Sequence, residues 1–149
     1  MATATVSLLI PDPMLLPPRE AAYRLQSVYE LVAYGCRQEI ALDWGDSHLV
    51  VRVDEDTDTL SAQFHGSPFG PTEAYRNVGS CSPWDRLVGK ECDWTWVAVN
   101  KQGYCDIMLL SFDVMLPQVI FHALASSIEV FTISQELKGK NEVDGGDVS

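Results

Sequence analysis

Basic residues are scarce in this sequence. Its 149 residues include 10 Lys and Arg against 21 Asp and Glu, which gives a formal net charge of −11 at neutral pH. The basic residues are scattered singly from Arg19 to Lys140. Because binding to DNA or RNA needs clustered basic side chains that displace counterions from phosphate, this composition argues against direct nucleic-acid binding. It disfavours an anionic membrane surface for the same reason.

Long hydrophobic runs and a secretory signal are also missing. The longest apolar-leaning stretch, residues 114–128, is interrupted by Pro117, Gln118 and His122 and is too short to cross a bilayer. The first ten residues contain no Lys or Arg, so we expect no export signal. In such a chain, four sparse cysteines favour reduced thiols and a cytoplasmic location. These cysteines are Cys36, Cys81, Cys92 and Cys105.

Local signatures of catalysis are absent as well. The sequence contains no glycine-rich phosphate loop, no nucleophile elbow and no helix with paired histidines. His48, His65 and His122 lie far from one another and from the cysteines, so neither a zinc site nor an activated nucleophile is assembled locally. The sequence therefore predicts no catalytic residue, no metal and no cofactor. A site whose residues meet only in the fold stays open.

The composition is otherwise that of a globular protein. Hydrophobic residues make up 46% of the chain and charged residues 21%, and 149 residues suffice for one packed domain. Prolines dominate the first eighteen residues, and the last fourteen offer almost no apolar side chain. We therefore expect an N-terminal arm over residues 1–18, one domain over 19–135 and a disordered acidic tail over 136–149.

A first β-hairpin is predicted over residues 40–53. Apolar and polar residues alternate over 40–44 and again over 49–53, which is the pattern of two half-buried strands. Gly45 lies between them and can adopt the positive φ that a hairpin turn needs. Residues 60–64 continue the alternation and indicate a third strand of the same meander.

A second β-hairpin is predicted further along the chain. Residues 94–99 are apolar on both faces, as in a central strand, and residues 100–103 form a turn before the strand 104–112. Cys92 and Cys105 belong to the two arms of this hairpin. We expect both to pack in the core, where they could approach each other.

The remaining segments decide the fold class. Residues 27–34 favour a strand over a helix, and residues 127–133 predict a final strand. Residues 19–26 and 117–124 are expected to be short helices, with a further helical turn over 84–88. The glycine- and proline-rich stretch 65–83 predicts a long connection across one end of the sheet. The prediction is an α+β fold, mainly antiparallel β-sheet with one or two short helices.

The densest charge cluster is a candidate binding site in an acidic turn. Its carboxylates belong to Asp54, Glu55, Asp56 and Asp58. A calcium loop starting at Asp54 would need Gly at position 59 and Glu at position 65, where the chain has Thr and His, so a calcium site is rejected. Such turns usually lie in solvent, but exposed acidic charge also attracts basic partners.

The tryptophans form a second candidate set. Large aromatic side chains either fill a core or anchor an interface. Core packing is the preferred interpretation for Trp94 and Trp96, which share one face of a strand. The alternative is a partly exposed aromatic groove that includes Trp44 and Trp84 beside the glycine-rich loop. Its rim would consist of Asp43, Asp46, Asp85 and Asp93.

Several short motifs also recur in a known group of proteins. They are Gly89-Lys90, Asn100, Gln102-Gly103-Tyr104, Asp106 and the run Ala125-Ser126-Ser127-Ile128. In these motifs the chain resembles, over residues 25–133, a family of small acidic bacterial proteins without known function. Many domains of this general kind are similar to immunity proteins, which bind and silence a toxin. The resemblance implies no catalytic residues.

Together these features predict a non-enzymatic protein-binding domain. An acidic and aromatic surface would recognise a basic protein partner, as an immunity-like or inhibitor protein does, because long-range attraction speeds association. Two alternatives stay open at this point. The chain could be a small-ligand or metal-binding module, or an enzyme whose site is assembled only in the fold.

Overall fold

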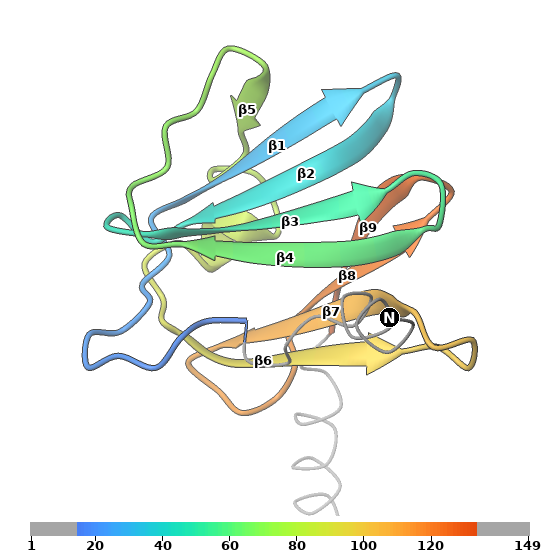
Figure 1. Cartoon of the computed structure of the whole chain (residues 1–149). Helices are drawn as coiled ribbons and strands as arrows, with labels where there is room; N and C mark the ends of the chain where they lie inside the picture. Colours follow the sequence, from blue (N-terminus) through green and yellow to red (C-terminus); the bar gives the residue numbers. More distant parts are fainter. Residues whose placement is uncertain (1–14, 134–149) are drawn as a thin grey trace, which may run out of the picture.

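The computed structural model describes residues 15–133, which fold into two antiparallel β-sheets (Figure 1). The first sheet has five strands in the order β4-β3-β2-β1-β5, and the second has four in the order β6-β7-β8-β9. The strands are β1 (Ser27–Ala33), β2 (Cys36–Asp43), β3 (His48–Asp54), β4 (Thr59–His65), β5 (Tyr75–Asn77), β6 (Cys92–Val99), β7 (Cys105–Phe112), β8 (Val119–Leu124) and β9 (Ser127–Thr132).

Both predicted hairpins are confirmed, together with the third strand of the first meander and the final strand. In the β2–β3 turn, Gly45 has φ +96°, and its N–H donates a hydrogen bond to Asp43 Oδ1 at 2.9 Å. In the β6–β7 turn, Gly103 has φ +91°, and its N–H donates to Asn100 O at 2.9 Å. Glycine adopts these backbone angles without steric cost, so each turn could be located from sequence.

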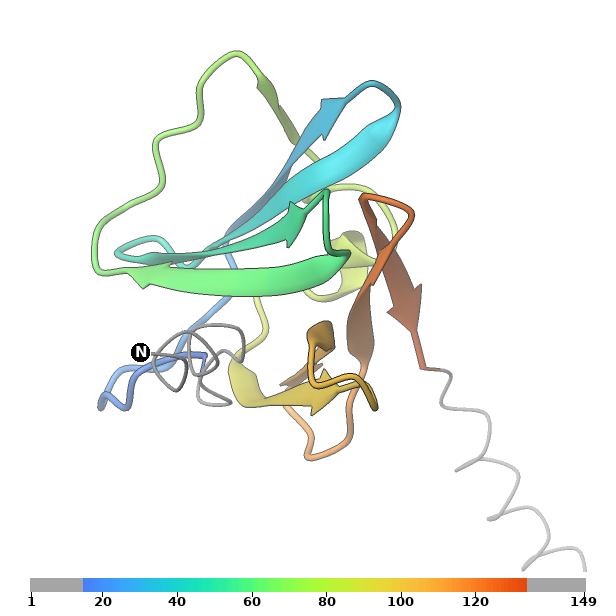
Figure 2. The ribbon, with the colours of Figure 1, turned by 45° about the vertical axis from the view of Figure 1, so that its right-hand side comes forward.

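The core lies between the two sheets. Strand β2 packs next to β9 and β4 next to β7, so the second sheet closes one side of the first (Figure 2). Hydrogen bonds reinforce this junction: Arg37 N donates to Ser127 Oγ at 2.9 Å, and Gln38 Nε2 donates to Ser126 O at 3.1 Å. The largest fully buried side chains include Trp84, Phe112, Phe121, Leu25, Ile40 and Met108.

The predicted α+β class is wrong, because the described residues form an all-β fold. Residues 19–26 are not helical: Leu25 N donates to Lys90 O, Leu25 O accepts from Gly89 N, and Gln26 N donates to Asp43 O. Their backbone groups therefore bond to distant segments instead of to their own next turn. The described chain contains one helical piece, the 3₁₀ turn η1 (Trp84–Arg86), where a helical turn was expected.

The second expected helix, over residues 117–124, is strand β8. Val119, Phe121 and Ala123 are buried in the core, and Ile120 and Leu124 lie on the opposite face. This alternation has a period of two, and β-branched residues fit it better than they fit a helix. Helix propensity is a weak guide wherever tertiary packing offers a strand partner on both sides.

Strand β6 is an edge strand, although its apolar character on both faces predicted a central one. Only one of its faces packs on the core; the other faces outward. A sequence pattern that is apolar on both faces cannot distinguish burial on both sides from burial on one side and an apolar surface on the other.

The predicted N-terminal arm and C-terminal tail fall largely outside the described residues. The tail over 136–149 and most of the arm over 1–18 belong to the parts that the structure leaves undescribed. The described end of the arm begins with Leu15, whose side chain is buried in the core. Within residues 15–133 there is no helix of the length and apolarity needed to span a membrane.

Candidate binding surface

The outward side of the second sheet carries a continuous row of apolar side chains. On β7, Met108, Leu110 and Phe112 point to the core, so Leu109 points outward. In the strand register, one outward-pointing apolar residue of each strand is paired with one on the neighbouring strand. The row consists of Trp96, Leu109, Ile120 and Phe131, and it crosses all four strands. We call this side of the β6–β9 sheet, together with Trp94 and Leu124, the outer face.

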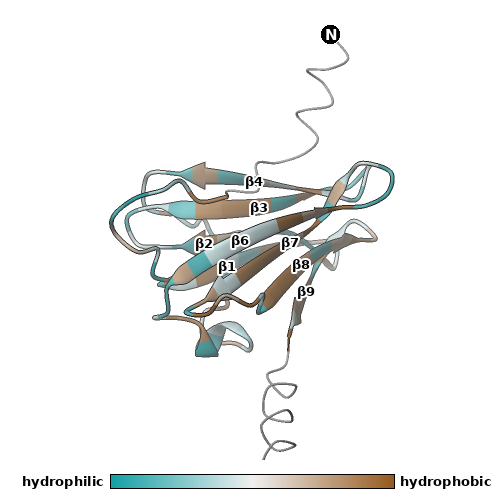
Figure 3. Ribbon diagram, turned by 90° about the horizontal axis from the view of Figure 1, so that it is seen from below, coloured by the Kyte–Doolittle hydropathy of each residue, from teal (hydrophilic) through white to brown (hydrophobic). Residues whose placement is uncertain are grey.

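The outer face is partly open to solvent. Trp94 is 46% exposed, Phe131 48% and Leu124 52%. The loop between β7 and β8 adds Met115 and Leu116, both more than half exposed. Figure 3 shows that the colouring of β7 and β8 is mostly hydrophobic. Single exposed apolar residues are normal, but a contiguous group on one sheet face marks an interaction site.

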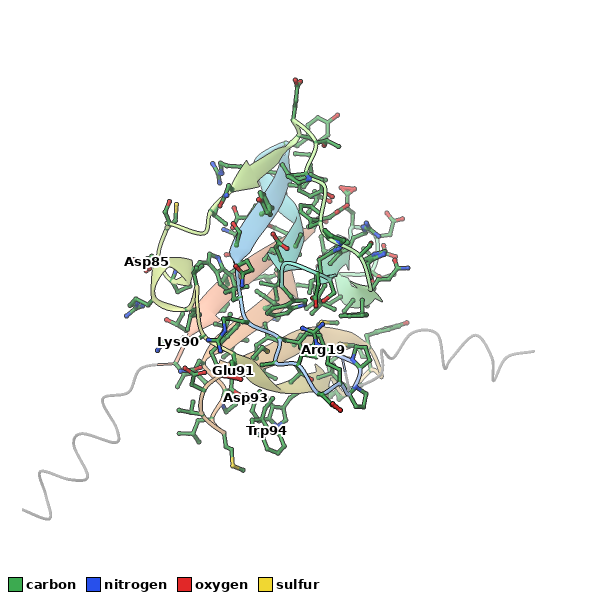
Figure 4. The ribbon with its side chains drawn as sticks, turned by 90° about the vertical axis from the view of Figure 1, so that its left-hand side faces the viewer. Arg19, Asp85, Lys90, Glu91, Asp93 and Trp94 are labelled. Atoms are coloured by element: carbon green, nitrogen blue, oxygen red, sulfur yellow. The ribbon has the colours of Figure 1, made fainter. Side chains whose placement is uncertain are left out.

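The strands of the outer face carry acidic residues, and the nearby cations Lys90 and Lys101 lie outside the strands, at opposite ends of the β6–β7 hairpin. None of the four strands β6–β9 contains a Lys or Arg. Glu129 lies on the outer face beside the apolar row, and Asp106 Oδ2 lies 3.9 Å from His122 Nε2. Near Trp94, Figure 4 shows Asp93 and Glu91 above the indole ring, which projects away from the sheet. The surface therefore combines an apolar centre with carboxylates.

The first sheet also has an outward side, but it is covered. The predicted long connection contains the short strand β5 and a loop, residues 66–74, that lies over this side. The Phe69 ring lies 5.0 Å from that of Tyr29, 5.1 Å from that of His48 and 5.2 Å from that of Tyr75, between ring centroids. His48 Nδ1 donates a hydrogen bond to Ser67 O at 2.7 Å. Beneath this cover, Val50 is 7% exposed.

A polar network completes the cover of the first sheet. Glu39 Oε1 accepts a hydrogen bond from Tyr75 Oη at 2.6 Å, and Glu39 Oε2 accepts one from Arg52 Nε at 3.0 Å. Burial raises the pKa of Glu39, but these two hydrogen bonds outweigh it and hold the pKa below its ordinary value. Burial and the Glu39 carboxylate together raise the pKa of Tyr75 to about 12.

A buried carboxylate that the sequence did not reveal joins the two sheets. Glu30 is 5% exposed, and its oxygens accept hydrogen bonds from Arg37 Nε at 2.8 Å and Arg76 Nη2 at 3.2 Å. Arg37 also donates to Ile128 O in β9. Since Glu30 occupies a core-facing strand position, only the spatial approach of two arginines makes a carboxylate tolerable there.

The acidic turn, residues 54–58, forms hydrogen bonds with the β8–β9 turn of the second sheet. Asp58 Oδ1 accepts a hydrogen bond from Ser126 N at 2.6 Å, and Ser126 Oγ donates to Glu55 O at 3.0 Å. Asp54 Oδ1 accepts from Asp56 N at 2.9 Å. Asp54 and Asp58 thus shape the turn, whereas within residues 15–133 no hydrogen bond to another residue engages the carboxylates of Glu55 and Asp56.

The four tryptophans separate into two pairs, so the single aromatic groove considered as the alternative to core packing does not form. Trp44 is 4% exposed and packs edge-on against Tyr23. Trp84 is 2% exposed, and its ring centroid lies 6.0 Å from that of Phe121. Trp94 and Trp96 lie on the outer face instead, and the preferred core interpretation is wrong for Trp94. Of the proposed rim carboxylates, Asp46 is held by Arg19 in an ion pair at 3.0 Å.

The cysteines do not form a site. Cys92 and Cys105 are buried, as predicted, but they pair with Phe112 and Val99 at opposite ends of the hairpin. Burial and the nearby Asp93 raise the pKa of the Cys92 thiol to about 12. All four cysteines are free. Between residues 15 and 133 no three His, Cys, Asp or Glu side chains gather in a way that could hold a metal ion.

A family model matches residues 21–136 of the chain, and its description is a family of unknown function (DUF6334). The match includes every strand of both sheets. No curated protein and no solved structure matches the chain. These comparisons supply no ligand, partner or activity, so the surface itself must indicate the function.

Proposed function

The chain belongs to the DUF6334 family, whose function is unknown, and we propose that it is a protein-binding domain whose partner docks on the outer face of the β6–β9 sheet. The apolar row across the four strands supports this most directly, because the described residues leave Phe131 in the row and Trp94 beside it about half exposed. Water in contact with such a face is unfavourable, and a partner that removes it gains about 25 cal/mol for each Å² of apolar surface.

The charges indicate the chemistry of that partner. The outer face carries carboxylates and no basic side chain from its own strands, and the whole chain has a net charge of −11. A second copy of the chain would bring acidic rims together and lose energy by repulsion. A partner with an apolar centre surrounded by Lys and Arg would match the surface, and its positive charge would speed association.

Trp94, Trp96 and Phe131 are the expected anchors of this interface. Binding energy in protein interfaces concentrates in a few large side chains, with tryptophan strongly enriched among them. Trp94 and Trp96 lie on the edge strand β6 and Phe131 on the opposite edge strand β9. Because all three stand on a hydrogen-bonded sheet, little backbone entropy is lost when they become buried.

An immunity-like or inhibitory role is the specific form of this hypothesis. A domain that docks on the basic surface of another protein blocks that surface by occupying it, and it needs no catalytic residues of its own. Exposed carboxylates such as Glu55 and Asp56 would add to the long-range attraction without touching the partner.

The test compares an outer-face variant with a matched control. Immobilised wild-type protein, the double variant Trp94→Ala/Phe131→Ala and the control Tyr34→Ala are exposed to lysate, and any protein held in stoichiometric amount is identified. Tyr34 is a fully exposed aromatic residue in the β1–β2 turn, away from the outer face. The dissociation constant of each variant is then measured with the purified partner at two salt concentrations.

We expect the partner to bind wild type and Tyr34→Ala equally, and the outer-face variant at least about tenfold more weakly, which corresponds to about 1.4 kcal/mol. Added salt should slow association, since exposed charges are screened beyond about 8 Å at physiological ionic strength. Equal affinities for all three proteins would remove the outer face from the interface. An acidic partner would contradict the charge argument.

A further inference from the structure

A cavity lies at one end of the second sheet, where β6 begins and β7 ends. It has a volume of about 700 Å³, within the range of about 300–1,000 Å³ that is typical of small-molecule sites. The 3₁₀ turn η1 with the residues after it forms one wall, and the β7–β8 loop with the end of β9 forms the other. Its apolar lining includes Leu87, Phe112, Val114 and Ile133.

Unpaired positive charge marks this cavity. Eight basic residues lie between positions 15 and 133, and five of them form ion pairs with carboxylates. The five are Arg19, Arg24, Arg37, Arg52 and Arg76. Of the other three, Arg86 and Lys90 both line the cavity, and Lys101 lies in the β6–β7 turn. In a chain with a net charge of −11, it is unusual that two cations without ion-pair partners line the same cavity.

The other polar groups of the lining leave hydrogen-bond donors available. Gln118 Oε1 already accepts a hydrogen bond from Phe112 N at 2.5 Å, so the amide NH₂ of Gln118 is the group it can offer to a ligand. Asp113 is the single acidic residue of the lining, and its Oδ1 is engaged by Glu91 N at 3.0 Å. The lining therefore carries one net positive charge and an unengaged donor.

We propose that this cavity binds a small organic carboxylate whose body is apolar, with the carboxylate held by Arg86 and Lys90. An arginine guanidinium can donate two parallel hydrogen bonds to a carboxylate, and a lysine ammonium adds a point charge. The apolar part of the ligand lies against Val114 and Ile133, which are 39% and 43% exposed in the lining of the cavity. Figure 4 shows Lys90 on the flank of the molecule that η1 occupies, away from the tip of Trp94.

This site is independent of the partner surface proposed above. The cavity residues belong to loops and strand ends at one margin of the second sheet, and none of them is in the apolar row of the outer face. Failure of one proposal therefore leaves the other standing.

Octanoate is the probe for the full-length protein, followed by amide NMR shifts and a titrated dissociation constant. Octanamide has the same apolar chain without the charge, and butyrate keeps the charge with a much shorter chain. The tested variant is Arg86→Gln/Lys90→Gln. Its matched control is Lys101→Gln, which removes the third unpaired cation from the opposite end of the β6–β7 hairpin.

We expect octanoate to shift the amides of residues 86–90 and 112–118 in wild type and in Lys101→Gln. The double variant should bind octanoate at least about tenfold more weakly, and octanamide and butyrate should bind wild type more weakly by a similar factor. Absence of shifts at millimolar octanoate would overturn the proposal. Equal binding of octanamide would overturn it as well, as would shifts confined to the outer-face residues Trp96, Leu109 and Ile120.

Discussion

The two sheets differ in what happens to their outward sides. On the first sheet, the loop 66–74 lies over the outward side, and Phe69 packs against three aromatic rings there. On the second sheet, the outward side carries apolar residues of similar size, but Trp94 and Phe131 remain about half exposed. The same antiparallel architecture thus contains one face that a described loop covers and one that residues 15–133 leave partly open.

Connection length accounts for this difference. The first sheet has a connection of nine residues between β4 and β5, long enough to fold back over the strands. The connections within the second sheet are shorter, with five residues between β6 and β7, six between β7 and β8 and two between β8 and β9. An apolar face without a covering segment of its own is the general property of a docking surface. The contrast therefore supports the partner hypothesis more strongly than the total charge does.

A charge placed on the outward side of each sheet should produce the largest difference in stability between the two sheets. Val50→Asp puts a carboxylate under the loop at a position that is 7% exposed, whereas Leu124→Asp puts one on the outer face at a position that is 52% exposed. An unpaired buried charge costs about 3–5 kcal/mol, and an exposed substitution usually costs about 0.5 kcal/mol or less. Urea denaturation midpoints measure both. Equal losses of stability would show that the two sides are covered alike.

A change in the β6–β7 turn should have an intermediate effect. Gly103→Val forces a branched side chain into φ +91°, which should reduce the free energy of unfolding by about 1–3 kcal/mol. Gly66→Val is the control in the covering loop of the first sheet, because neither position has an atom within 4 Å of an added Cβ and only Gly103 has positive φ. Denaturation of both variants measures the difference. An unchanged midpoint for Gly103→Val would reject backbone strain as the constraint.

The smallest expected effect concerns alkaline pH and the covered side. The pKa of Tyr75 is raised to about 12 in the folded protein, against 10.0 for an unperturbed tyrosine. Its contribution to stability is therefore complete below pH 10 and is lost as pH rises from 10 towards 12. Tyr75→Phe should make the fall in stability over this range shallower, as measured by urea denaturation at several pH values.

Part of the alkaline loss should persist in Tyr75→Phe. Burial also raises the pKa of Tyr23 and of the Cys92 and Cys105 thiols, so ionisation of these groups also lowers the stability of the folded protein at alkaline pH. Tyr23→Phe serves as the comparison for a phenol outside the covering network. A pH profile of Tyr75→Phe identical to that of wild type would mean that the Glu39–Tyr75 contact does not hold the cover in place.

Sequence alone determined the local elements of this protein. Alternation over residues 40–53 and the glycines at 45 and 103 located both hairpins, because strand period and positive φ are properties of a few consecutive residues. The scarcity of basic residues likewise argues against nucleic-acid binding without reference to any fold. Those inferences needed no knowledge of what lies across the core. The histidines are isolated only in the sequence, because in the structure the rings of His48 and His65 stack with their centroids 4.6 Å apart.

Tertiary structure alone decided which faces are covered. Residues 19–26 and 117–124 do not form the expected helices, because their backbone groups bond to segments distant in the sequence. The buried Glu30 carboxylate is stable only because Arg37 and Arg76 donate hydrogen bonds to it. Trp94 was expected in the core because an apolar residue looks the same in sequence whether its face is buried or open. The difference depends on whether another segment returns over that face, and this is a contact between residues far apart in the chain.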